Sequence, residues 1–289
     1  MKIIVLAKQV PDTRNVGKDA MKEDGTINRA VLPAIFNPED LNALEQALVL
    51  KEQHPGSTIT LLTMGPPRAS EIIKEAIYRG ADNGYLLTDR AFAGADTLAT
   101  SYALATAIKH ICGTPDVILC GRQAIDGDTA QVGPQVAQKL GLNAITYCEE
   151  IQRIENKTIT VKRRLERGVE IVKAPLPLLV TVTGSAVPCR SRNAKRLQKY
   201  KYAATPSEIA TATEAHQNLW NECSYLHLHE LSAADINADL EQCGLNGSPT
   251  KVKKVENVVF KSKEVRRIAP TDQEIEELVR ELMNNHTIG

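Results

Sequence analysis

The chain has 289 residues, of which 43% are hydrophobic and 24% charged, the composition of an ordinary globular protein. Its 35 Lys and Arg side chains balance 35 Asp and Glu, so no bulk positive charge argues for nucleic-acid binding. Aromatic residues make up only 4%, too few for a surface on which bases stack.

No segment has the features of an export signal or a membrane span. The N-terminal apolar run is too short for a signal peptide and is interrupted by Lys8. No apolar run approaches the length that crosses a bilayer. The six cysteines form no CxxC pair and no metal-ligand spacing. We therefore expect a cytoplasmic protein with reduced thiols, no metal ion and no membrane insertion.

Strand and helix patterns alternate through the first half of the chain. The apolar run Lys2–Ala7 predicts a central parallel strand, and residues 19–32 predict a polar hairpin or loop. Asn37 is the expected N-cap of a leucine-rich helix that starts at Pro38. The next predicted elements are strands at 58–63, 83–87 and 117–120, separated by helices at 68–79 and 97–108.

This order predicts a doubly wound, mostly parallel α/β sheet. Right-handed crossovers place the loops after the strands at one edge, so Lys8, Gly65, Asp89 and the loop 121–128 should share one crevice. Lys8 is a candidate phosphate or flavin contact there, and an ordinary solvated lysine is the alternative. The chain has no GxGxxG after the first strand and no P-loop motif, so neither usual nucleotide fingerprint applies.

The stretch 115–141 is the most informative of these units. A buried strand ends at Gly121 and leads to the polar turn IDGDT, where Gly127 makes a positive φ tolerable and lets backbone N–H groups approach a ligand. Asp128 stands three residues before Gln131, the spacing of a helix N-cap and its reciprocal partner, and Gly141 ends the helix. Free N–H groups at such a helix start suit a phosphate or diphosphate. An ordinary strand-to-helix turn with a well-made cap is the alternative.

After Ala144 the pattern changes to an antiparallel hairpin. Residues 158–165 alternate in polarity, and residues 169–173 follow across a tight turn. A buried strand that starts at Pro175 comes next, and the chain then becomes basic and irregular over residues 190–201. This basic segment fits either a solvated helix face or a docking loop for a partner protein.

The C-terminal third has no periodic core between residues 203 and 264. His227 and His229 lack the neighbouring carboxylates or thiols of a metal site, so we expect them at the surface or in packing. Residues 271–283 predict an amphipathic helix that Thr271 caps, with Glu274 at the matching position.

Two regions follow from these patterns. Residues 1–184 form the predicted nucleotide-binding α/β domain, and residues 185–289 form a docking loop and a C-terminal arm. A tail of about a hundred residues with so little core needs a partner surface to pack on. We expect its hydrophobic residues to be buried only against another subunit.

Several motifs together resemble the beta subunit of electron-transfer flavoprotein. They are LAKQVPDT at the N-terminus, FNPEDLNALEQAL at the first helix, TMGP after the second strand, GRQAIDGDTAQVGP, the hairpin with PLPLLVTV, and the basic segment. The resemblance covers essentially the whole chain, and GRQAIDGDTAQVGP is its most specific part. A departure occurs at Arg167, where the family hairpin usually carries an acidic residue or glycine.

The resemblance implies a Rossmann-like fold of the adenine-nucleotide-binding type, with an added β-hairpin and an extended C-terminal arm ending in a helix. It implies a heterodimer with an electron-transfer flavoprotein alpha subunit, which carries the electron-transferring FAD. Acyl-CoA dehydrogenase-like or other redox proteins would dock on the basic segment. A second nucleotide is expected within the beta subunit: AMP in the housekeeping type, or FAD, which meets NADH, in the electron-bifurcating type.

This chain looks more like the bifurcating type because it contains VPDT, DRAFAGADT, DGDTAQVGP and CGLNGSPT. By resemblance, the adenosine half of the nucleotide is expected at Ala7, Asn37, Thr63, Met64 and Gly65. The phosphates are expected at Gly127, Asp128, Thr129, Ala130, Gln131 and Val132. The rest of the expected cofactor-binding set is Arg122 and, nearer the flavin ring and NADH, Lys8, Val10, Pro11, Phe92 and Thr97.

No catalytic acid, base or nucleophile is expected, because the cofactor carries the chemistry and the protein positions it. In the bifurcating type, NADH would reduce the beta flavin, and the two electrons would part to a high-potential and a low-potential acceptor. The alternatives are a housekeeping electron shuttle with AMP, and an adenine-nucleotide-binding module without a redox role. The flavin content of the purified heterodimer separates them.

Overall fold

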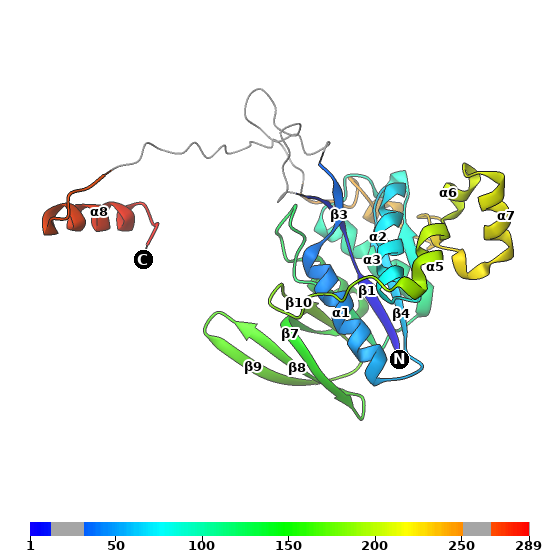
Figure 1. Ribbon diagram of the computed structural model, residues 1–289, viewed down its shortest axis with the longest axis horizontal. Coiled ribbons are helices and arrows are strands. Elements are labelled where there is room, and N and C mark those ends of the chain that lie inside the picture. Colours follow the sequence, from blue (N-terminus) through cyan, green and yellow to red (C-terminus); the bar gives the residue numbers. More distant parts are fainter. Residues whose placement is uncertain (13–31, 251–266, 289) are drawn as a thin grey trace, which may run out of the picture.

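The computed structural model describes residues 1–12, 32–250 and 267–288. Its body is a sheet covered by helices, and the C-terminal helix lies apart from that body (Figure 1). The polar hairpin predicted at 19–32 lies outside the described residues, apart from Leu32.

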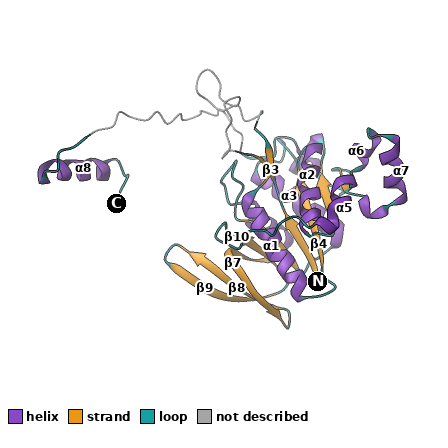
Figure 2. Ribbon diagram, viewed as in Figure 1, coloured by secondary structure: helices purple, strands orange, loops and turns teal. Residues whose placement is uncertain are grey.

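A nine-stranded sheet forms the centre of the body (Figure 2). The strands of the described residues, including two that lie outside this sheet, are β1 (Lys2–Leu6), β2 (Gln9–Pro11), β3 (Ala34–Phe36), β4 (Thr58–Met64), β5 (Asn83–Leu87), β6 (Val117–Gly121), β7 (Asn143–Glu155), β8 (Thr158–Leu165), β9 (Gly168–Pro175), β10 (Leu178–Val182) and β11 (His229–Leu231). The order in the large sheet is β11-β5-β4-β1-β6-β10-β7-β8-β9, and β2 pairs separately with β3. Neighbours from β11 to β7 are parallel, while β7, β8 and β9 run antiparallel, as the predicted hairpin requires.

Helices cover both faces of the sheet. The α-helices are α1 (Pro38–Gln53), α2 (Ser70–Arg79), α3 (Thr97–Cys112), α4 (Val132–Leu140), α5 (Leu197–Tyr202), α6 (Pro206–Ala210), α7 (Glu214–Glu222) and α8 (Asp272–Asn284). Short 3-10 helices are η3 (Pro67–Ala69), η4 (Arg90–Phe92), η5 (Ala194–Arg196), η6 (Ser224–Leu226) and η7 (Leu240–Gln242). Helices α1 and α2 pack on one face, and α3 and α4 pack on the other.

The residues of β1 show how these two layers arise. Ile3 and Val5 lie in the core with α1 and α2, whereas Ile4 and Leu6 lie in the core with α3 and α4. A strand buried on both faces needs an apolar residue at every position, so it appears in the sequence as a continuous apolar run. The doubly wound, mostly parallel sheet is therefore confirmed.

The long strand β7 was not predicted. Its buried residues Ile145, Cys148 and Ile151 are three positions apart. The pairing with β8 shifts register between Cys148 and Glu150 and again between Ile151 and Arg153. Each bulge adds a residue to one strand, so the alternation that marks a strand in the sequence is lost.

The C-terminal region completes one edge of the sheet. β11 pairs in parallel with β5, and Leu226 and Leu231 are buried. The expectation that hydrophobic residues after Gly184 would be buried only against another subunit is therefore wrong for this region. His229 stacks on Tyr85 with ring centroids 4.4 Å apart, which confirms a packing role for that histidine.

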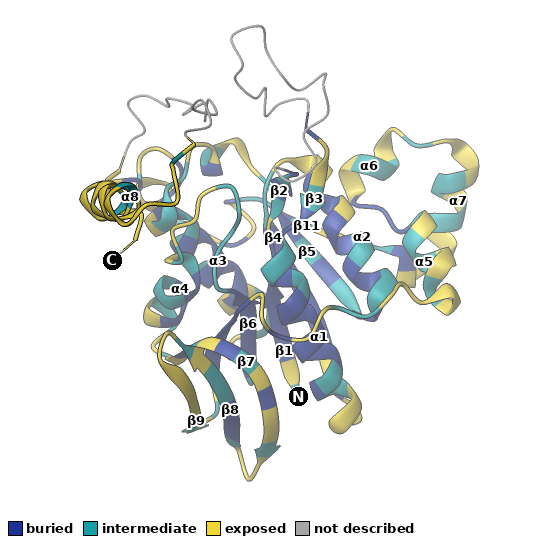
Figure 3. Cartoon of the chain, turned by 60° about the vertical axis from the view of Figure 1, so that its left-hand side comes forward, coloured by how far each residue is buried: buried dark blue, intermediate teal, exposed yellow. Residues whose placement is uncertain are grey.

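Helix α8 exposes its apolar face. Thr271 caps it as predicted, because the Thr271 hydroxyl accepts a hydrogen bond from the Glu274 N–H. None of the residues of α8 is buried (Figure 3), and Ile275, Val279 and Met283 remain exposed. The expectation of a partner surface for the C-terminal region therefore rests on this helix.

Candidate functional site

The carboxyl ends of β1 and β6 lie side by side where the strand order reverses. The chain leaves β1 toward β4 on one side, and β6 flanks β1 on the other. Ligands of doubly wound sheets bind outside such a switch point. The loops that follow these strands start at Ala7 and Arg122, and they contain about half of the predicted site residues.

Asn37 occupies the N-cap position of α1, but its side chain does not cap the helix. Its Nδ2 donates to the carbonyl oxygen of Gln123 at 2.9 Å, and its Oδ1 accepts from the Ile125 N–H at 3.2 Å. Asn37 is fully buried, and the loop after β6 supplies backbone groups that need partners there. The predicted position is confirmed, while the predicted capping contact is replaced by contacts across the crevice.

The next two acidic residues of α1 bind the same loop. Glu39 accepts from the Gln123 N–H at 3.0 Å and pairs with the Arg122 guanidinium at 3.2 Å. Arg122, predicted as a cofactor contact, is therefore paired with a carboxylate of the protein. Asp40 accepts from the N–H groups of Gly121 and Lys8, both at 2.8 Å. Burial raises the pKa of Asp40 to about 7, against these two donors, which lower it.

The polar turn IDGDT does not form the cap that its sequence predicts. Helix α4 begins at Val132 with Gln131 at the N-cap position, and no side chain caps it. The Asp128 carboxylate instead accepts a hydrogen bond from Gln123 Nε2 at 2.8 Å. The prediction of Asp128 as N-cap is therefore wrong, because the helix starts a full turn later than the Asp128–Gln131 spacing implies. Gly141 ends α4 in a left-handed conformation, as predicted.

The backbone of residues 127–133 leaves a run of hydrogen-bond donors without partners. Asp128 and Ala130 have left-handed φ angles of 49° and 52°, whereas Gly127, where a positive φ would be tolerated, does not have one. The N–H groups of residues 129–133 meet no acceptor in the described part of the chain. Successive free N–H groups next to a helix N-terminus make a concavity that binds anions.

Two side-chain contacts fix the flanks of this segment. Lys8 Nζ pairs with the Asp126 carboxylate at 2.7 Å, although half of the Lys8 side chain is exposed. Thr97 Oγ1 donates to Gln131 Oε1 at 2.8 Å, so the starts of α3 and α4 lie together. Lys8 therefore reaches the predicted crevice, with its charge paired to a residue of the loop.

The residues predicted for the adenosine half lie at the ends of β1 and β4. Ala7 and Gly65 donate their N–H groups to carbonyl oxygens of neighbouring strands. Thr63 is fully buried, and its Oγ1 has no partner among the described residues. Met64, next to it, is half-buried. Because buried hydroxyl groups nearly always find a partner, the Thr63 Oγ1 is an available contact for a ligand.

Two of the residues predicted near a flavin ring are buried in the interior of the protein. Val10 and Phe92 are only 1% and 6% exposed. Phe92 belongs to the core that packs against α3 and α4, and Pro11 ends β2. In this structure the two hydrophobic side chains are part of the interior and present no apolar wall to a ligand.

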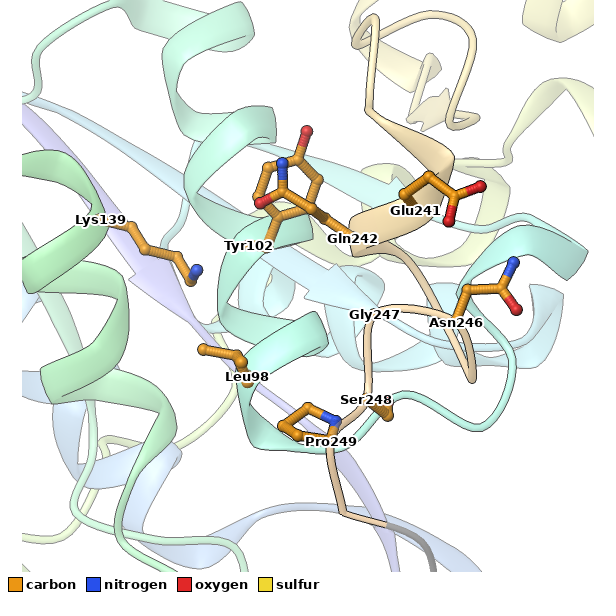
Figure 4. Close-up of a pocket in the computed structure, with 9 residues that line it drawn as sticks. All are labelled: Leu98, Tyr102, Lys139, Glu241, Gln242, Asn246, Gly247, Ser248 and Pro249. Carbon is orange, nitrogen blue, oxygen red and sulfur yellow. The ribbon is translucent and has the colours of Figure 1, made fainter.

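Two cavities flank this region, and neither is lined by residues 127–133. A cavity of about 560 Å³ lies beside the start of α1 and includes Glu39, Arg122 and Gln123. A second, of about 300 Å³, lies between α3, α4 and the segment after η7 (Figure 4). There Lys139 reaches from α4 toward Tyr102 of α3, with Nζ 5.7 Å from the ring centroid.

The basic segment 190–201 is anchored to the body instead of lying free in solvent. Arg190 pairs with Glu45 at 2.8 Å and also with Glu52, both on α1. Arg196 donates to a backbone carbonyl just after α2 at 2.6 Å. Leu197 remains 47% exposed between these anchored residues. The segment therefore presents an apolar side chain on a fixed backbone.

Residues 1–12, 32–250 and 267–288 contain neither a membrane-spanning helix nor a metal-binding cluster. No helix in these ranges is long and apolar enough to cross a membrane. They contain no group of three or more His, Cys, Asp or Glu side chains that could hold a metal ion. All six cysteines are free.

Comparison with known proteins agrees with this geometry. The family model "Electron transfer flavoprotein domain" matches residues 24–209. The chain is 46% identical to subunit CarD of the caffeyl-CoA reductase-Etf complex of Acetobacterium woodii, over 87% of this chain and 86% of that protein. It is 41% identical to the electron transfer flavoprotein subunit beta of Megasphaera elsdenii, over 96% and 98% of the two chains. It is also 39% identical to the acryloyl-CoA reductase electron transfer subunit gamma of Anaerotignum propionicum, over the full length of both.

The matched region contains the loop after β6, the residues at the start of α1 that contact it, and the unpaired N–H groups before α4. The relatives match along nearly their whole length, so the resemblance extends beyond the nucleotide crevice. The chain therefore belongs to the electron transfer flavoprotein family, as a beta subunit that takes part in electron transfer.

Proposed function

We propose that this beta subunit binds FAD with the diphosphate at residues 129–133, and that it serves a heterodimer in which NADH is the electron donor and electrons are bifurcated. The observation that carries the proposal is the run of unpaired N–H groups at 129–133. A diphosphate offers acceptor oxygens on two phosphorus atoms, so a longer run of donors suits it better than it suits a single phosphate.

Two motifs that favour the FAD-binding type support the proposal because they meet in space. The Asp96 carboxylate accepts a hydrogen bond from Thr250 Oγ1 at 2.6 Å, and the Asp96 N–H donates to Ser248 Oγ at 2.8 Å. Asp96 caps α3, and the next residue, Thr97, contacts Gln131. DRAFAGADT and CGLNGSPT therefore stand together beside the segment proposed to hold the phosphates.

When bound, the flavin supplies the hydride and single-electron chemistry. The protein's part is to bind and orient. The N–H groups of 129–133 would hold the phosphates, and the Thr63 hydroxyl would bond the adenosine half. The Lys8–Asp126 pair keeps the loop closed over the end of β1.

A housekeeping shuttle with AMP is the second candidate, and one observation favours it. Val10 and Phe92 are buried, so neither offers a surface on which a flavin ring could lie. AMP has no such ring and needs only the adenosine and phosphate contacts. The two candidates therefore differ in what occupies the space beyond the first phosphate.

Two partner surfaces belong to this proposal. The exposed apolar face of α8 would pack on the alpha subunit, since an unpartnered face of this kind is typical of an interface. Leu197 on its anchored basic segment would be the contact for an acyl-CoA dehydrogenase-like or other redox protein. An exposed hydrophobic residue ringed by charged ones suits a transient complex.

The test is the nucleotide content of the heterodimer. The two subunits are co-expressed, the complex is denatured, and FAD and AMP are quantified. Two FAD per heterodimer, with the second bleached by NADH, are expected. One FAD with AMP recovered would support the housekeeping shuttle, and loss of all nucleotide from a folded complex would contradict both.

A further inference from the structure

Asn37 and the first turn of α1 accept hydrogen bonds from alternate N–H groups of the last residue of β6 and the loop after it. Asp40 accepts from residue 121, Glu39 from residue 123 and Asn37 from residue 125. Asn37 also donates to the carbonyl of residue 123. One helical turn thus provides most of the partners for five residues of loop backbone far away in the sequence.

The same turn ties this loop to the end of β1. The second carboxylate oxygen of Asp40 accepts from the Lys8 N–H at 2.8 Å. The Lys8 side chain returns to Asp126 at 2.7 Å, which closes a ring of contacts around the switch point. A Cβ on Gly121 would lie 2.5 Å from Asp40 Oδ1, so the approach of the loop to the helix leaves no room for a side chain.

These contacts also engage the carboxylates of the two acidic residues at the start of α1. Glu39 is occupied by Arg122 and by the N–H of Gln123, and Asp40 is occupied by two backbone donors. Negative groups beside a phosphate would otherwise repel it. These carboxylate oxygens are engaged, whereas the N–H groups of residues 129–133 remain free among the described residues.

We propose that Asn37, Glu39 and Asp40 are positioning residues that hold the loop after β6 and thereby set the affinity of the crevice for the nucleotide phosphates. This inference rests on the proposed function. These side chains would act on the nucleotide indirectly, by holding the loop, because their polar atoms bond the loop backbone. Residues 121–125 are the fixed part of the loop, and residues 129–133 are the part that receives the anion.

The test compares two buried carboxylates on α1 in the complex with the alpha subunit. Asp40→Asn keeps the size of the side chain but turns one acceptor into a donor that faces a backbone N–H. Glu45→Gln is the matched control, because Glu45 is equally buried at 6% exposure but pairs with Arg190 instead of the loop. AMP and FAD dissociation constants are measured by calorimetry, and amide hydrogen exchange is followed in peptides that cover 121–133.

Asp40→Asn is expected to weaken nucleotide binding roughly tenfold or more and to speed exchange over 121–133 in the nucleotide-free complex. Glu45→Gln should lower thermal stability while leaving affinity within about twofold. Glu39→Gln, at a less buried position, provides the same readouts should Asp40→Asn not fold. Unchanged exchange and affinity in both loop variants, or equal losses in Glu45→Gln, would overturn the proposal.

The exchange measurement separates this proposal from the proposed function. Wild-type complex that binds neither AMP nor FAD would contradict the nucleotide site itself. Wild-type complex that binds nucleotide, together with loop variants that bind it equally well, would contradict only the positioning role. Faster exchange over 121–133 without any change in affinity would show a structural contact alone and would also overturn it.

Discussion

The carboxylate of Asp96 holds Thr250 through both its N–H and its hydroxyl, at 3.1 and 2.6 Å. The other oxygen of the same carboxylate accepts from the N–H groups of Leu98 and Ala99 and so caps α3. One side chain thus caps α3 and holds Thr250, the last residue described before residue 251.

Substitution at these two positions separates the cap from the tether. Thr250→Val should remove the hydroxyl bond to Asp96 but keep the backbone N–H bond and the cap, and it should cost less than about 1 kcal/mol because the contact is exposed. Asp96→Ala should cost about 1 kcal/mol more, because α3 also loses its N-cap. Free energies of unfolding from urea titration check this. Equal losses in both variants would show that the cap contributes nothing.

The buried carboxylate of Asp40 predicts an unusual pH dependence. Burial raises its folded-state pKa to about 7, above the value of 3.8 expected when it is exposed in the unfolded chain. Between these values the folded state holds a proton that the unfolded state has released, so this group's contribution to stability falls as the pH rises. The slope approaches about 1.4 kcal/mol per pH unit within this window.

Asp40→Asn isolates that contribution. The difference in unfolding free energy between wild type and Asp40→Asn, measured from pH 4 to 8, should shift against wild type as the pH rises to about 7 and then level off. A difference that is flat across this range would show that Asp40 titrates normally.

Substitutions at Ala130 and Gly127, in and beside the segment proposed to hold the phosphates, should have opposite effects because only Ala130 has a left-handed backbone. Ala130→Val should destabilise the segment by about 1–2 kcal/mol and lower nucleotide retention, because a β-branched residue is poorly accommodated at a φ of 52°. Ala130→Gly should preserve retention. Gly127→Ala should be tolerated, since that residue lacks a positive φ and a Cβ there meets nothing within 4 Å. Nucleotide recovered per purified heterodimer is the measurement, and a reversed order would contradict the geometry.

Substitutions of exposed residues in the anchored basic segment should change the rate of electron transfer to a docked partner without changing the stability of the fold. Leu197→Ala should slow electron transfer to a dehydrogenase partner severalfold without lowering stability, because its side chain is 47% exposed. Charge reversal at Lys195, also exposed, should weaken the salt dependence of that rate. Stopped-flow rates at several ionic strengths give both quantities.

Arg190 is the matched contrast in the same segment. Arg190→Glu should destabilise the fold, because Glu45 and Glu52 would lose their partner and face a like charge. A change at Arg190 therefore does not report on docking alone. A stable Arg190→Glu variant with a slowed transfer rate would restore a docking role for this arginine.

Much of the sheet could be predicted because its signals are local. The run Ile3–Ala7 is apolar at every position, since both faces of β1 are buried. Glycines at 80 and 141 mark helix ends, and Thr271 with Glu274 marks a helix start. Each signal depends on residues within a few positions of one another, so the sequence alone carries it.

Tertiary structure decided the elements and contacts whose partners are distant in the sequence. β11 is only three residues long and is a strand because the edge of β5 accepts it. The Asn37 side chain bonds Gln123 and Ile125 instead of capping α1, and Arg190 pairs with Glu45 instead of lying in solvent. The site at 129–133 likewise depends on where α4 begins, and no spacing within IDGDTAQVGP determined that start. Hydrogen-bonding groups take whichever partner the folded chain brings within reach, and a sequence pattern contains no information on that distance.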